Sequence, residues 1–84
     1  MPGAGFEMPL NLYPSIYHSG SVPAGWTPTP GGLIKYPVRN RVLLRYLHQL
    51  LPGRWQKVIK KGIPGEVHYF EHVSGHVADV KYLP

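Results

Sequence analysis

The chain has 84 residues, enough for one modest domain, and nine Lys or Arg against four Asp or Glu give it a formal net charge of +5. It contains no Cys, which excludes disulfides and thiolate zinc sites. No apolar run approaches the roughly 18 residues of a membrane span, and the N-terminus lacks the pattern of a signal peptide.

The first part of the chain is rich in Pro and Gly. Residues 1–37 hold seven of the ten Pro and six of the ten Gly, a density that disfavours helices and central strands. The segment also contains Trp26 and several Tyr, Leu and Ile, so it is too apolar for a plain disordered linker. We therefore predict extended chain and turns over residues 1–36, packed partly on a domain formed by residues 37–84.

A helical pattern replaces this one from Pro37 to Leu51. Pro37 fits the first turn of a helix, and Pro52-Gly53 would end it. At about 100° per residue the apolar side chains fill one broad arc. This arc consists of Val42, Leu43, Leu44, Tyr46, Leu47, Leu50 and Leu51. The opposite arc carries Arg41, Arg45 and His48.

Three short antiparallel strands are predicted after the helix, at residues 54–61, 66–73 and 76–83, because β-branched and aromatic residues alternate there with Gly-containing turns. The predicted fold class is α+β, with one amphipathic helix packed on a three-stranded antiparallel sheet. A two-residue Ser74-Gly75 loop would set Glu71 opposite Ala78 and Tyr69 opposite Val80.

This register divides the last hairpin into two faces. We expect the leucine arc of the helix to pack on the apolar face, formed by Val67, Tyr69, Val80 and Tyr82. The other face would gather polar groups around Phe70, namely His68, His72, Asp79 and Lys81.

The polar face contains groups that metal-free RNA cleavage requires. That reaction requires a base for the 2′-hydroxyl, an acid for the 5′ leaving oxygen and a cation for the charged phosphorane. Histidine titrates near neutrality and suits both proton transfers, while Lys81 or a nearby Arg could stabilise the charge. We predict His68, His72 and Lys81 as catalytic residues, with the order of the histidine roles open. The alternative is a set of ordinary exposed residues in weak surface pairs.

The same strand spells a zinc motif, H-x-x-E-H, from His68 to His72. That motif binds metal from a helix, whereas Pro64-Gly65 and Ser74-Gly75 bracket a run that favours a strand. The second of these turns would also move His76 away from the other two imidazoles. We therefore predict no metal site and no cofactor.

Basic residues dominate the middle of the chain. Eight of the nine Lys and Arg lie between Lys35 and Lys61, a segment without Asp or Glu. We expect a positive face that binds a polyanion, with phosphate backbones favoured over an acidic protein or an anionic membrane. The predicted RNA- or phosphate-binding residues are Arg41, Arg45, Arg54, Lys57, Lys60 and Lys61. The alternative is a solvated helix face followed by a Lys-rich edge strand that limits aggregation.

A basic helix followed by this His- and Lys-containing sheet, with Val67-His68-Tyr69-Phe70 and Gly75-His76-Val77-Ala78-Asp79-Val80-Lys81, resembles the C-terminal toxin domains of bacterial polymorphic and contact-dependent toxins. The resemblance covers residues 37–84. Many such domains are small metal-independent ribonucleases of the barnase, EndoU, colicin and RelE-like group.

The resemblance implies an endoribonuclease toxin that cleaves tRNA or mRNA in the cytoplasm of a bacterial target cell. It further implies release from a larger secreted or surface protein and an acidic immunity or antitoxin partner. Two other functions stay open: a non-catalytic nucleic-acid-binding module, and a small interaction protein that docks an acidic partner.

Overall fold

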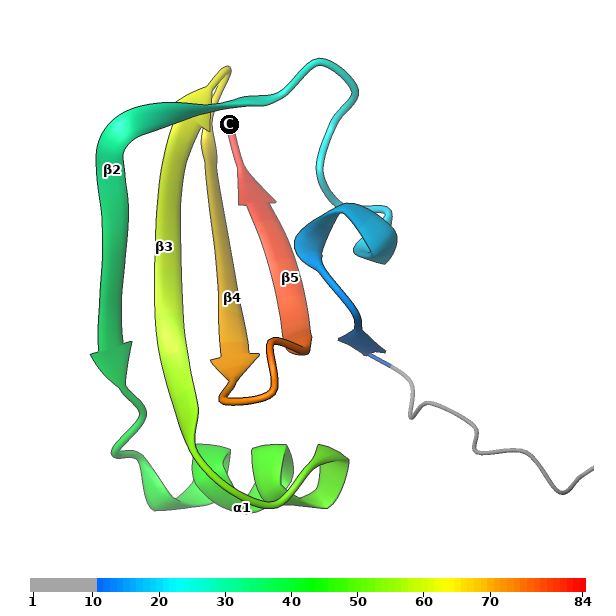
Figure 1. Ribbon diagram of the computed structural model, residues 1–84, viewed down its shortest axis with the longest axis vertical. Helices are drawn as coiled ribbons and strands as arrows, with labels where there is room; N and C mark the ends of the chain where they lie inside the picture. Colours follow the sequence, from blue (N-terminus) through cyan, green and yellow to red (C-terminus); the bar gives the residue numbers. More distant parts are fainter. Residues whose placement is uncertain (1–10) are drawn as a thin grey trace, which may run out of the picture.

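A five-stranded antiparallel sheet organises residues 11–84, the part of the chain that the computed structural model describes (Figure 1). The elements in chain order are β1 (Leu12–Tyr13), the 3-10 helix η1 (Ile16–Ser19), β2 (Thr27–Pro37), α1 (Arg41–Leu50), β3 (Trp55–Ile63), β4 (Glu66–His72) and β5 (Val77–Leu83). Across the sheet the strands lie in the order β1-β5-β4-β3-β2. The predicted α+β class, with one α-helix and an antiparallel sheet, is confirmed. The predicted number of three strands is wrong, because β1 and β2 come from the segment expected to be coil.

Strand β2 shows how a Pro-rich segment joins a sheet. It runs for 11 residues along one edge and pairs only with β3. Proline cannot donate a hydrogen bond to a neighbouring strand, but an edge strand has one side that requires no partner. Gly31, with a φ of 76°, lies where the register shifts between Pro28 and Leu33. The prediction of coil is therefore wrong for residues 27–36.

Helix α1 begins at Arg41, because Pro37 ends β2 instead of opening the helix. Asn40 caps the first turn: its Oδ1 accepts a hydrogen bond from the Leu43 backbone N–H at 3.0 Å. Leu47, in the middle of the predicted apolar arc, is fully buried. The helix is thus where the sequence places it, with a start four residues later. Its apolar arc is buried around Leu47, but Val42, predicted as part of the arc, is 76% exposed.

Apolar cores lie on both faces of the sheet. One face, here the helix face, packs against α1, and its buried residues are Leu12, Leu47, Trp55 and Ala78, with Phe70 partly buried among them. The other, here the Trp26 face, packs against η1 and the loop after it, and its buried residues are Ile16, Trp26, Val58, Val67, Tyr69 and Val77. The predicted packing of the helix on Val67 and Tyr69 is therefore wrong, because the N-terminal segment occupies that face.

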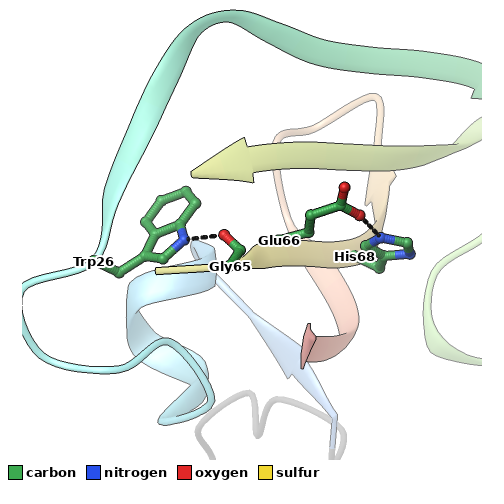
Figure 2. A network of polar contacts seen from close by, with 4 residues as sticks. All are labelled: Trp26, Gly65, Glu66 and His68. Carbon is green, nitrogen blue, oxygen red and sulfur yellow. Dashed lines mark hydrogen bonds and ion pairs between the residues drawn. The ribbon is translucent and has the colours of Figure 1, made fainter. Parts of the chain in front are cut away.

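The helix covers only one end of its face. Figure 1 shows α1 lying across the end of the sheet where β3 begins and where β4 turns into β5. At the other end, the Trp26 indole Nε1–H donates a hydrogen bond to the carbonyl of Gly65 at 2.8 Å, in the turn between β3 and β4 (Figure 2). This bond anchors the N-terminal segment to the Trp26 face. On the helix face, α1 stays at the opposite end, so part of that face has no helix over it (Figure 1).

The β4–β5 hairpin departs from the predicted register near its turn. Its loop has three residues, Val73 to Gly75, because the His72 N–H bonds the carbonyl of His76 at 2.8 Å. Gly75 has a φ of 97°, the left-handed conformation typical of three-residue hairpin loops.

This longer loop pairs Glu71 with Val77 rather than with Ala78. A bulge then restores the predicted register farther along, where His68 lies opposite Lys81 and Val67 opposite Tyr82. Asp79, with a φ of 51°, is the residue left over in β5 between these two registers.

Candidate nucleic-acid interface

Cross-strand pairing aligns two rows of side chains on the helix face. The first row joins β2 to β5 through Tyr36, Lys57, Phe70 and Ala78. The second row runs parallel to it through Ile34, Ile59, His68 and Lys81. Paired residues of neighbouring strands share a face, with Cβ atoms roughly 5 Å apart. The first row borders α1, because Phe70 and Ala78 belong to the core that packs on the helix, and the second row lies farther from it. Together the two rows bring apolar, aromatic and cationic side chains onto one face of the sheet.

His68 is the predicted catalytic residue with the most suitable surroundings. Its side chain is 21% exposed, and its Nε2 lies 2.9 Å from Oε2 of Glu66 (Figure 2). The carboxylate can only accept, so Nε2 carries the proton and Nδ1 stays free for proton transfer. Lys81 lies directly across from His68 on β5 and is exposed.

Glu66 is absent from the residues predicted from sequence. It stands two positions before His68 on the same strand, and the two-residue period of a strand places such neighbours on one face. That spacing, Glu-x-His in a strand, is the signal that could have found it.

His72 lies in different surroundings. It is buried, 9% exposed, and its ring packs edge-on against Trp55 with centroids 5.1 Å apart. Its Nε2–H donates to the carbonyl of Pro52 at 2.8 Å, while Nδ1 accepts from the hydroxyl and the backbone N–H of Ser74 at 2.8 and 3.0 Å. Both ring nitrogens thus have protein partners beside the loop that follows α1.

The two predicted catalytic histidines are also far apart along the strand. His72 is four positions after His68, which in a β-strand corresponds to about 13 Å. One scissile phosphate cannot contact both imidazoles at that separation. The structure brings His68 together with Lys81 and does not bring His72 to them.

The predicted phosphate-binding residues fall into separate groups. Arg41 and Arg45 are exposed on α1 and line a shallow hollow together with His48. Arg54 is exposed and borders a larger cavity of about 830 Å³ between α1 and the adjoining ends of β3 and β4. These three guanidinium groups lie at the helix end of the molecule.

The lysines of β3 are divided between the two faces. Lys57 pairs with Phe70 and lies on the helix face, whereas Lys60 pairs with Val67 and lies on the Trp26 face. Lys61 is exposed near the far end of the strand. A single continuous basic face is therefore not formed, because strand alternation sends neighbouring lysines to opposite sides.

Carboxylates neutralise little of this charge. Among residues 11–84, Lys35 is the one Lys or Arg in an ion pair, 2.9 Å from Oε1 of Glu71. Asp79 accepts a hydrogen bond from the hydroxyl of Tyr46 at 2.9 Å. Burial, together with this bond and the charge of Asp79, raises the pKa of Tyr46. The remaining cations of the described chain keep their charge available for a ligand.

A separate hollow lies beside the first turn of α1. It has a volume of about 510 Å³ and is lined by Tyr36, Arg39, Asn40, Lys57 and Phe70, among others. The Lys57 ammonium stands 4.8 Å from the centroid of the Phe70 ring, a cation–π contact. Tyr36 is 47% exposed.

The H-x-x-E-H run lies in strand β4, and within the described residues no group of three or more His, Cys, Asp or Glu is arranged to hold a metal ion. No helix in the same part of the chain is long and apolar enough to cross a membrane. The chain matches no protein-family model, and comparisons with curated proteins and with solved structures find no similar protein.

Proposed function

We propose that the chain is a metal-independent endoribonuclease whose reaction site is the second row of the helix face. The observation that carries this proposal is the cluster of Glu66, His68 and Lys81. A carboxylate fixes the tautomer of an imidazole at 2.9 Å, and Lys81 is the cross-strand partner of that histidine on β5. Lys57, two residues from the Ile59 partner of His68, adds positive charge to the same face.

The residues have distinct roles in this mechanism. His68 Nδ1 takes the proton from the 2′-hydroxyl, which attacks the phosphorus to form the cyclic phosphate as the bond to the 5′-oxygen breaks. Lys81 stabilises the charge on the phosphorane and donates the proton to the leaving oxygen. Glu66 is a positioning residue that holds Nε2–H and supports the imidazolium formed during the reaction. His72 is left out of this mechanism because both of its nitrogens already have partners.

Cleavage of tRNA in EDTA tests the proposal, with the 2′,3′-cyclic phosphate as the measured product. His68→Ala should lower kcat by about 100- to 10,000-fold, the usual contribution of general acid–base catalysis. His76→Ala, at the other end of the same hairpin, is the matched control and should cleave at the wild-type rate. Equal activity of the His68→Ala variant, or loss of cleavage with EDTA, would overturn the mechanism.

A second candidate function is RNA binding without cleavage. The observation that favours it is the isolation of His68 from His72, because the site then has one histidine where the sequence predicts two. This candidate predicts salt-sensitive RNA binding, no cyclic phosphate, and weaker binding after Arg41→Glu or Arg45→Glu. Binding of the His68→Ala variant would be unchanged.

The biological setting belongs to the same proposal. A ribonuclease toxin acting in the bacterial cytoplasm should stop growth when expressed without its acidic immunity protein, and the His68→Ala variant should be harmless. An acidic inhibitor would be attracted by the uncompensated cations around Arg41, Arg45 and Arg54. Growth of a bacterial host expressing the wild-type chain at the level of the variant would contradict the toxin role.

A further inference from the structure

The hollow beside the first turn of α1 has the composition of a nucleobase site. Tyr36, Lys57 and Phe70 come from three adjacent strands and are consecutive cross-strand partners, so an aromatic ring, a cation and a second aromatic ring follow one another across the sheet. The hollow of about 510 Å³ lies within the usual size range of small-ligand sites. Unstacked bases bind on aromatic rings, and cations beside the rings hold the phosphates.

Tyr36 and its neighbour Arg39 both differ from core residues. Its side chain is 47% exposed although it lies on the same face as the partly buried Phe70. Its neighbour in the hollow, Arg39, is exposed and has no carboxylate partner among residues 11–84. An exposed aromatic ring beside a guanidinium group without an ion-pair partner suits a ligand that combines a planar ring with an anionic group.

We propose that this hollow binds one unstacked nucleobase of single-stranded RNA, stacked on Tyr36, with its phosphate at Lys57 and Arg39. The inference rests on the proposed RNA contact. Phe70 is two residues from His68 on the same face of β4, or about 7 Å along the strand. Tyr36, on which the base stacks, lies two strands from Phe70, or about 10 Å across the sheet. A base in the hollow therefore belongs to a nucleotide one or two positions from the one at His68, which makes the hollow a specificity subsite for the cleavage position.

Binding can be measured separately from cleavage. The probe is a fluorescent six-nucleotide RNA with 2′-O-methyl groups, which cannot form the cyclic phosphate, and its matched control carries one abasic position. Inorganic polyphosphate serves as an anion without bases. The variants are Tyr36→Leu and, as a control, Leu33→Ala, a similarly exposed position of β2 (50% exposed) on the opposite face.

Tyr36→Leu should weaken binding of the RNA probe about 5- to 150-fold, the usual effect of losing one base–aromatic stack. It should leave polyphosphate binding unchanged, and the abasic probe should bind the wild-type chain as weakly as the intact probe binds the variant. Leu33→Ala should bind all probes like the wild type.

Equal RNA affinity of Tyr36→Leu and wild type would overturn the subsite, as would an abasic position that costs no affinity at any place in the probe. A wild-type chain that binds no RNA would overturn it as well. Cleavage is not part of this measurement. Failure of the ribonuclease mechanism would appear separately, as absence of the cyclic phosphate in the tRNA assay.

Discussion

Replacing His72 with alanine separates a structural histidine from a catalytic one. The imidazole donates to Pro52, accepts from Ser74 and packs on Trp55. A hydrogen bond contributes about 1 kcal/mol net, and an aromatic edge contact about 1 kcal/mol more. With the bonds on both ring nitrogens lost, we expect His72→Ala to lower the free energy of unfolding by about 3 kcal/mol.

That loss is large for this chain, because a domain of its length is stabilised by about 4 to 12 kcal/mol in total. Urea unfolding followed by tryptophan fluorescence measures it at low temperature, where the variant stays folded. His72→Gln retains a donor for Pro52 and should lose less. The His76 ring bonds only Ser74 within residues 11–84, so His76→Ala should lose about 1 kcal/mol or less.

Cleavage by the folded fraction of His72→Ala supplies the decisive comparison. We expect the rate per folded molecule to match that of the wild type, since the ring is about 13 Å from His68. Wild-type stability combined with loss of cleavage would refute the structural role and restore His72 as an acid or base.

Two further predictions concern the Trp26 face. A Cβ at Gly62 would stand 2.5 Å from the Trp26 indole. Gly62→Ala should therefore displace the ring and lower the free energy of unfolding in urea by about 1 to 3 kcal/mol. Lys61→Ala is the neutral control, and equal stability of the two variants would contradict this packing. Burial, with the charges of Glu71 and Tyr17, raises the pKa of Tyr69 to about 12. Above pH 10 the folded state therefore keeps the Tyr69 hydroxyl protonated while the unfolded state loses this proton. The free energy of unfolding should fall by up to about 1.4 kcal/mol per pH unit from pH 10 to 12. Tyr69→Phe should flatten that decline, and an unchanged pH profile would contradict the shift.

The sequence predicts the helix and the last three strands because their signals are local. The apolar arc around Leu47 repeats at the helical period, and the strands alternate between Gly-containing turns. The hairpin loop was harder to predict, since Ser74-Gly75 fits both a two-residue loop and the last two positions of a three-residue loop. That single extra residue, Val73, moves Glu71 to a new partner, and the bulge at Asp79 has no sequence signal of its own.

The packing of the helix depends on information that is not local. Both faces of the sheet are apolar, one around Val67 and the other around Trp55 and Phe70, and the helix could cover either. The choice is decided by Trp26, which takes the first face and bonds Gly65, 39 positions later in the chain. The spacing of apolar residues within the helix cannot predict a contact between two other segments of the chain. The sequence therefore predicts the buried side of the helix around Leu47, with Val42 wrongly included, and does not predict which strand residues cover it.

In the candidate site, too, the residue positions set by local sequence are predicted correctly and those set by long-range contacts are not. His68 and Lys81 are correctly placed across from each other because the register is right at their end of the hairpin. Their relation to His72 is wrong because four residues of extended chain span about 13 Å, and because the loop after α1 reaches His72 through Pro52. Local spacing therefore predicts the pairing of His68 with Lys81, but it does not predict the long-range contacts that make His72 a structural residue.

The two faces of the sheet also differ in how their charges are compensated. On the Trp26 face, Lys35 is held by Glu71, and Lys60 is partly buried. On the helix face, Glu66 bonds His68, so Lys57 and Lys81 have no carboxylate partner among residues 11–84. The polyanion that we propose as ligand would therefore gain more on the helix face, part of which α1 leaves uncovered, than on the face where the N-terminal segment packs.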